Sequence, residues 1–200
     1  MKQNILILGP SRAGKTTLTK KLNEELNYSI INFDNLVHAF EVSFPQLEIC
    51  FGAGAENTAT NIAMFLTHYL HVLSIRSNQK NGIKFAAEGG YFDFVKIMSE
   101  INRKEMARDF LFIGLVYNNK TPDELFHDIR KNDTKEDWSY NCDDETLKKC
   151  VDIFINDSKQ LYDQFKEYNF MIYDVSNNRE QVLNDIINDI KYKSNTQKTY

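Results

Sequence analysis

The sequence begins with a short, unbroken apolar run that ends in glycine. Ile5 to Leu8 carry no polar side chain, Gly9 follows at once, and Lys15 to Leu26 then has the pattern of a helix. A run of this kind suits a strand that is buried on both faces, and such strands occur in parallel sheets covered by helices. This feature directs the chain toward an α/β fold built from strand–loop–helix units.

The same alternation continues along the chain. Short β-rich runs recur at 29–33, 83–87, 110–117 and 170–173, and the segments between them carry apolar residues at helical spacing. We therefore predict an α/β fold with a doubly wound, mainly parallel sheet of five strands and helices on both faces. For 200 residues, one hydrophobic core is enough, so we predict a single domain over 1–193 and a flexible tail at 194–200.

Two intervals are longer than a minimal connection. Both 35–79 and 120–168 follow the carboxyl ends of expected strands, where ligands bind in open α/β sheets. We expect 35–79 to bind an acceptor and 120–141 to form a lid insertion. The second interval opens with Thr121, Pro122 and Glu124, which have the spacing of a capping box with proline at the first helical position.

Composition and net charge limit the kinds of binding partner and the cellular location that we expect. The net charge of −4 and the pI of about 5.6 provide no positive field, which argues against nucleic acid or an anionic membrane as the main partner. The three cysteines form no CxxC pair, which is typical of free thiols in a reducing cytosol. The first apolar run is too short for a signal peptide, and no stretch is apolar enough to span a bilayer. We expect a cytoplasmic protein.

The segment between the first strand and the first helix carries the clearest motif. Residues 9–16 read G-P-S-R-A-G-K-T, a full match to G-x-x-x-x-G-K-[ST]. Glycines let successive backbone N–H groups converge on a phosphate, and the helix N-terminus adds partial positive charge. The lysine reaches the β- and γ-phosphates, and the threonine hydroxyl can bind Mg²⁺. We expect ATP to contact Gly9, Pro10, Ser11, Arg12, Ala13, Gly14, Lys15, Thr16 and Thr17.

At these residues the chain resembles the P-loop NTPases. Its size makes it similar to their small-molecule and nucleotide kinases, the group that holds adenylate, shikimate and gluconate kinases. The resemblance implies a P-loop kinase-like fold, binding of ATP with Mg²⁺, and transfer of the γ-phosphoryl group to a small acceptor. Many nucleoside monophosphate kinases carry a further glycine where this chain has Ala13.

Carboxylates follow the second and third strands. The resemblance to hydroxyl kinases implies that Asp34 accepts the proton of the acceptor hydroxyl. Their D-x-D pair reads Asn32-Phe33-Asp34 here, so the first acid and its metal role are missing. The alternative is that Asp34 only caps a helix at 36–40. Glu88, before Gly89 and Gly90, is the expected second ligand of Mg²⁺ beside Thr16, and the alternative is a tight turn.

The expected lid contains a group of basic residues. The resemblance implies that a lid arginine neutralises charge on the transferred phosphoryl group, and Arg130 is our candidate, with Lys131 and Lys135 as substitutes. The alternative is a basic helix end exposed to solvent. Arg12, although inside the loop, is a weaker candidate for this role and is expected to be closer to an ordinary surface charge.

These residues together predict an ATP- and Mg²⁺-dependent phosphotransferase, with Lys15, Asp34 and Arg130 as its catalytic residues. Two alternatives stay open. A nucleoside or nucleoside monophosphate kinase has the same fold and a different acceptor. A nucleotide-binding switch or assembly ATPase hydrolyses ATP slowly and needs no acceptor.

The complete loop motif generates the first prediction. The protein binds ATP with Mg²⁺, and Lys15→Ala abolishes phosphoryl transfer while leaving the fold intact, because this lysine serves the ligand. Isothermal titration calorimetry with ATP and circular dichroism of both proteins provide the measurement. Equal ATP affinities of the wild type and the variant would contradict the assignment.

Overall fold

The computed structural model describes residues 3–52 and 57–196, which form one sheet and the helices around it. The strands are β1 (Asn4–Leu8), β2 (Ser29–Asn32), β3 (Phe85–Glu88), β4 (Phe110–Val116) and β5 (Met171–Asp174). The helices are α1 (Lys15–Leu26), α2 (Phe33–Ser43), α3 (Thr58–Ser77), α4 (Phe94–Arg103), α5 (Pro122–Asn132), α6 (Asp144–Glu167) and α7 (Arg179–Thr196), and short 3-10 turns lie at Pro45–Leu47 and Ala107–Asp109.

The sheet has the order β2-β3-β1-β4-β5, and neighbouring strands pair in parallel throughout. The predicted α/β class with a parallel sheet of five strands is confirmed. Strand boundaries differ from the expected ones by one or two residues. β3 starts at Phe85, and Ile83, which the expected strand included, is exposed.

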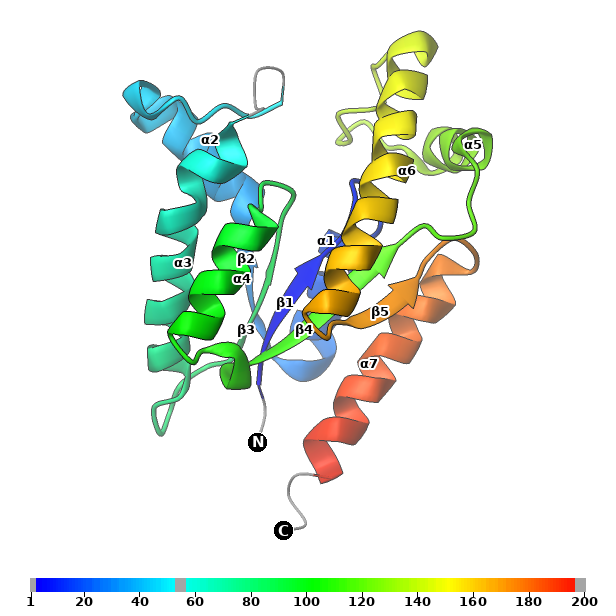
Figure 1. Cartoon of the computed structure of the whole chain (residues 1–200). Coiled ribbons are helices and arrows are strands. Elements are labelled where there is room, and N and C mark those ends of the chain that lie inside the picture. The colour runs from blue at the N-terminus through cyan, green and yellow to red at the C-terminus, as the bar shows by residue number, and fades with distance from the viewer. Residues whose placement is uncertain (1–2, 53–56, 197–200) are drawn as a thin grey trace.

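Two apolar cores lie on the two faces of the sheet. Ile5 and Ile7 of β1 belong to one core and Leu6 and Leu8 to the other, because successive side chains of a strand point to opposite faces. Helices α1 and α7 contribute to the first core, whereas α2, α3 and α4 contribute to the second. The fold is therefore doubly wound, as Figure 1 shows.

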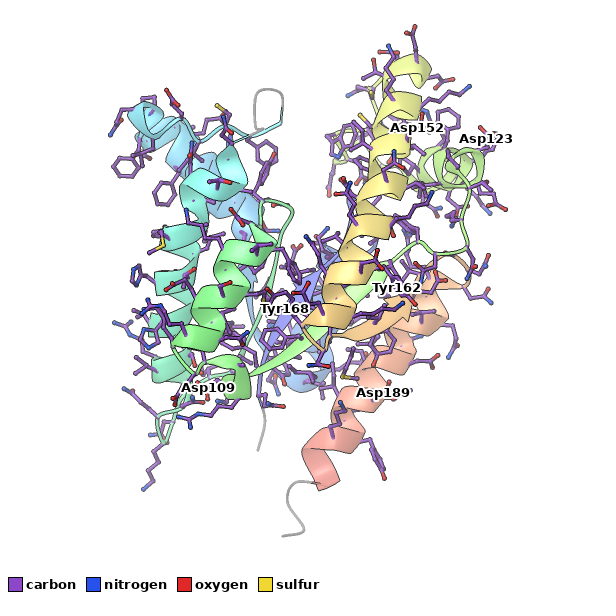
Figure 2. The ribbon with its side chains drawn as sticks, viewed as in Figure 1. Asp109, Asp123, Asp152, Tyr162, Tyr168 and Asp189 are labelled. Atoms are coloured by element: carbon purple, nitrogen blue, oxygen red, sulfur yellow. The ribbon has the colours of Figure 1, made fainter. Side chains whose placement is uncertain are left out.

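Helix α6 links both cores. Its first half contributes Leu147, Val151 and Ile155 to the core that includes α5, and its last turns place Phe165 in the other core. Figure 2 shows Tyr168 at the end of this helix near α4, where its ring meets Phe94 at 5.2 Å between centroids. The upper half of α6 is thereby held beyond the carboxyl ends of the strands (Figure 1).

The parallel strands end at a common edge. β1, β2 and β3 lie next to one another, so the residues after Leu8, Asn32 and Glu88 are brought together there. Helices α2 and α3 rise on one side of this edge, and α5 and α6 rise on the other (Figure 1). The fold thus gathers both long intervals of the sequence around the loop that follows β1.

The C-terminal helix α7 runs to Thr196, and its buried Ile187 and Ile190 anchor the turns that precede this polar end. The flexible tail expected at 194–200 stays a prediction. Residues 197–200 lie outside the described part. Within that part, no helix combines the length and the apolar content that crossing a bilayer requires. Cys50, Cys142 and Cys150 form no disulfide.

The contact between β4 and α6 generates a prediction. A Cβ atom on Gly114 would lie 2.3 Å from Cδ2 of Phe165, whose ring stacks on Phe170 at 4.8 Å. Gly114→Ala is expected to lower the free energy of unfolding by about 1–3 kcal/mol, because α6 must move away from the sheet. Urea denaturation measures this change. In a Phe165→Leu background, Gly114→Ala should lower the free energy of unfolding by a smaller amount. An equal loss in the two backgrounds would contradict the steric explanation.

Candidate phosphate-transfer site

The loop at 9–16 connects β1 to α1 and contains two glycines that the local geometry requires. A Cβ on Gly9 would lie 2.7 Å from the carbonyl oxygen of Leu115, so the loop passes against β4 too closely for a side chain. Gly14 has a φ of 95°, a left-handed conformation that glycine adopts without strain. The sequence motif therefore has a steric basis in this fold.

Lys15 lies beneath the loop with only 8% of its surface exposed. Its Nζ donates to the carbonyl oxygens of Gly9 and Pro10, at 3.0 and 2.9 Å. Burial lowers the pKa of Lys15, and the nearby carboxylates of Glu88 and Asp34 oppose this shift. A buried ammonium group that is held by carbonyls of the loop is placed to move onto phosphate oxygens.

Glu88, at the end of β3, is 1% exposed and forms a small polar cluster. Its Oε1 accepts a hydrogen bond from Thr16 Oγ1 at 3.0 Å and one from Asn32 Nδ2 at 2.6 Å. Burial raises the pKa of Glu88, and the positive charge of Lys15 partly offsets that effect. The cluster joins the loop, β2 and β3 and offers hydroxyl and carboxylate oxygens, which are ligands that Mg²⁺ prefers.

Asp34 lies in the first turn of α2 and points to the end of β3. Its Oδ1 accepts the N–H of Gly90 at 2.7 Å. The alternative interpretation, in which Asp34 caps a helix at 36–40, is wrong, because α2 starts at Phe33 and is capped by Asn32, whose Oδ1 accepts the N–H of Asn35. The carboxylate of Asp34 therefore links the first turn of α2 to the loop after β3.

Three cavities form a row along this edge. The phosphate pocket, about 410 Å³, contains the basic residues Arg12, Lys15, Lys20 and Arg179 together with Asp34 and Glu88. The end pocket, about 470 Å³, adjoins it between α5 and the start of α7 and shares Arg12 and Arg179. The α6 pocket, about 300 Å³, adjoins it on the other side and shares Ser11, Lys15 and Asp34.

The residues expected to bind ATP divide among these cavities. Ala13 is buried in the core, and the others line cavity walls. Those that line the phosphate pocket are Ser11, Arg12, Gly14, Lys15, Thr16 and Thr17, and Gly9 and Pro10 line the α6 pocket.

Solved structures show which fold this is. A shikimate kinase from Bacteroides thetaiotaomicron is 19% identical, with a TM-score of 0.58 and coverage of 94% of this chain and 98% of that one. A gluconokinase from Sinorhizobium meliloti is 10% identical, also with a TM-score of 0.58, and the match covers 100% of this chain and 98% of that one. The chain has the P-loop small-molecule kinase fold.

A shikimate kinase from Acinetobacter baumannii, solved in complex with shikimate, is 17% identical with a TM-score of 0.56, covering 96% of this chain and 94% of that one. No protein-family model and no curated protein sequence matches the chain. At these identities the likeness is one of fold.

Within the P-loop kinase fold, the loop arginine has an unexpected role. Arg12, which the sequence placed among weaker candidates, is only 18% exposed in its side chain and pairs with two acids of the 120–141 segment. Its Nη2 lies 2.6 Å from Asp133 Oδ1, and its Nη1 pairs with Asp137. Asp133 is 3% exposed in its side chain and also accepts a bond from Ser139. Arg12 therefore clamps this segment to the P-loop and is no ordinary surface charge.

Arg130 lies in the same segment with its guanidinium directed to the chain around it. It donates to the carbonyl oxygens of Ser139 and Cys142 at 2.9 and 2.6 Å, and it pairs with Asp144. It is absent from the walls of the three cavities, whereas Lys131 lines the end pocket. The geometry gives Arg130 a structural role between α5 and α6, and its catalytic role, like the lid function, stays a prediction.

Sequence reasoning missed two residues of the phosphate pocket's surroundings. Asn32 stands where the D-x-D pattern has its first acid. Its side-chain amide donates a hydrogen bond to the carboxylate of Glu88, which an aspartate carboxylate at this position could not do. Arg179 opens α7, and its Nη1 donates to the carbonyl oxygen of Arg12 at 3.3 Å. The signal available for Arg179 was its position after β5, since every strand of a parallel sheet delivers its following residues to one edge.

The clamp generates a prediction about stability. Arg12→Ala is expected to lower the free energy of unfolding by about 1–3 kcal/mol, because buried Asp133 then keeps only the more distant Arg130, whose Nη1 lies 4.0 Å from its Oδ2. Trypsin should also cut faster after Lys131 and Lys135. Urea denaturation and limited proteolysis measure the two effects. Lys149→Ala is the control, because it removes only an exposed ion pair with Glu145. It should leave the free energy of unfolding and the rate of trypsin cleavage unchanged. A stable, protease-resistant Arg12→Ala protein would contradict the clamp.

Proposed function

We propose that the protein is an ATP- and Mg²⁺-dependent phosphotransferase that moves the γ-phosphoryl group to a hydroxyl of a small-molecule acceptor. The observation that carries this proposal is the position of Lys15 and Asp34, which line both the phosphate pocket and the α6 pocket. A phosphoryl donor on one side and an acceptor on the other would meet at these two side chains. No described residue of 35–79, where the sequence analysis expected the acceptor, lines the α6 pocket.

The nucleotide fits the row formed by the end pocket and the phosphate pocket. The end pocket is lined by Tyr117, Asn177 and Asn178, which offer a ring and amides to a base and ribose. The basic side chains of the phosphate pocket match the charge of a triphosphate. With the nucleotide in this orientation, the γ-phosphate points toward the α6 pocket.

Mg²⁺ fits the cluster around Glu88. Thr16 Oγ1 and Glu88 Oε1 are 3.0 Å apart, so both oxygens can face one hydrated ion, and the hard oxygen donors suit this metal. When bound, Mg²⁺ supplies charge neutralisation for the phosphate oxygens. Asn32 would keep the Glu88 carboxylate oriented through its hydrogen bond, as outer partners of metal ligands do.

The chain's own residues then account for the transfer. Lys15 moves from the carbonyls of the loop to the phosphate oxygens and stabilises the charge that they carry in the transition state. Asp34, held by the N–H of Gly90, orients the acceptor hydroxyl and receives its proton. The hydroxyl oxygen forms a bond to the γ-phosphorus as the bond to the β-phosphate oxygen breaks, and ADP leaves.

The main test is ADP release by the purified protein with MgATP, measured with and without candidate acceptors. Acceptor-dependent ADP release together with a phosphorylated product supports the proposal. ADP release that no acceptor increases would support the alternative of a nucleotide-binding switch or assembly ATPase.

Asp34 generates the sharpest kinetic prediction. Asp34→Asn keeps an oxygen for the N–H of Gly90 but removes the proton acceptor, so kcat should fall by roughly 100-fold while ATP affinity changes little. Asp123→Asn, on the exposed side of α5, is a matched control (Figure 2). Steady-state kinetics and calorimetry measure the two quantities. Full activity of the Asp34→Asn protein would assign this carboxylate a structural role.

A further inference from the structure

The α6 pocket has an unusual set of polar side chains for a site next to a phosphate donor. Helix α6 contributes Phe154, Asp157, Gln160, Leu161 and Gln164 to its wall. Each of them lies three or four residues from another, which places them along one side of the helix. The opposite wall consists of the P-loop, Asp34 and Gly90.

The two cavities differ in their basic side chains, although the phosphate pocket also holds the carboxylates of Asp34, Glu88 and Asp137. The phosphate pocket contains four basic side chains, Arg12, Lys15, Lys20 and Arg179. Among the residues that line the α6 pocket, all of them described, Lys15 is the single basic one, and it is shared with the phosphate pocket. The α6 pocket holds two carboxylates, Asp34 and Asp157.

Lys15 cannot also serve an anionic group of the acceptor under the proposed mechanism, because its ammonium group is needed by the donor phosphates. Asp34 uses Oδ1 to hold the N–H of Gly90. Burial raises the pKa of Asp157, as expected for a carboxyl group that faces a cavity wall without a cation beside it. The amides of Gln160 and Gln164 are neutral and can bind hydroxyl groups as donors and as acceptors.

We propose that the acceptor is a hydroxyl compound without an anionic group: a polyol, a nucleoside or an amino alcohol, and not a hydroxy acid or a phosphate ester. This inference rests on the proposed function. A carboxylate or phosphate in the α6 pocket would face Asp34 and Asp157 with no cation to pair with, whereas neutral hydroxyls match the glutamine amides and an ammonium group matches Asp157.

The same argument separates the two nucleoside alternatives. A nucleoside monophosphate brings a dianionic phosphate into this cavity, but a nucleoside brings only hydroxyls and a base. The ring of Phe154 offers an apolar surface on the α6 wall. The inference therefore excludes nucleoside monophosphates as acceptors and keeps nucleosides.

The test uses compounds that share a carbon skeleton and differ in charge. The first set is D-gluconate, sorbitol and glucamine. The second set is glycerate, glycerol and 3-amino-1,2-propanediol. The third set is cytidine monophosphate and cytidine. Transfer from MgATP is measured as acceptor-dependent ADP release and as phosphorylated product. At least one neutral or amino compound should be phosphorylated, with kcat/KM about 100-fold or more above that of its anionic partner.

A binding readout independent of catalysis comes from Trp138. This tryptophan meets Phe154 edge-on at 6.3 Å between centroids, and Phe154 lines the α6 pocket. In the presence of a non-hydrolysable ATP analogue and Mg²⁺, the fluorescence of Trp138 should change with the neutral or amino compound that is phosphorylated. Its anionic partner should give no change at the same concentration.

Variants of α6 test the residue assignment. Asp157→Asn removes one carboxylate without changing the side-chain volume, and it should reduce the discrimination against the anionic partner by about tenfold. Asp152→Asn, on the same helix and outside the three cavities (Figure 2), should leave the discrimination unchanged.

Two results would overturn the inference. One is phosphorylation of an anionic compound at a rate equal to or above that of its neutral partner. The other is a panel in which only anionic compounds bind or react. Failure of the proposed function itself is distinguishable, because no compound of either charge would then be phosphorylated or increase ADP release.

Discussion

The buried ammonium group of Lys15 is the constraint around which this edge of the sheet is arranged. A cation with so little exposure needs partners, and it finds them in two carbonyl oxygens of its own loop and in the charges of Glu88 and Asp34. Glu88 ends β3, and Asp34 lies in the first turn of α2 directly after the neighbouring strand β2, so the position of the Lys15 side chain depends on the order of the strands.

The close packing of the loop serves the same arrangement. Gly9 lets the loop pass against the carbonyl oxygen of Leu115, and Gly89 lets the end of β3 approach Phe33, where a Cβ would lie 2.6 Å from Cβ of that residue. These approaches bring Thr16 and Asn32 within hydrogen-bond distance of Glu88. Glycine in these places is required by contact between elements, and the polar cluster depends on it.

Lys15 lies between the phosphate pocket and the α6 pocket, and these two cavities differ in their basic side chains. The proposed direction of phosphoryl transfer is based on this difference. Basic side chains gather on the side toward α7, whereas the side toward α6 has Lys15 as its single basic side chain together with Asp157 and two glutamine amides. Arg12 joins the P-loop to the segment after α5 through Asp133 and Asp137, so the basic side also holds the neighbouring segment in place. The proposed phosphoryl transfer would run from the first side to the second.

The sequence by itself determined the local features: the strand–loop–helix start, the loop motif, and the capping box of α5, in which Thr121 and Glu124 exchange hydrogen bonds as expected. Each depends on residues within a few positions of one another, where backbone geometry fixes the contacts. The class of fold followed from the same local patterns.

Only the tertiary structure decided the contacts between distant residues. Asn32 meets Glu88 across 56 positions and Arg12 meets Asp133 across 121, because strand order and helix docking set these distances and no local pattern encodes them. The roles of Asp34 and Arg130 were left open by the sequence for the same reason. A carboxylate after a strand can cap a helix or reach a neighbour, and which of the two occurs depends on what packs against it.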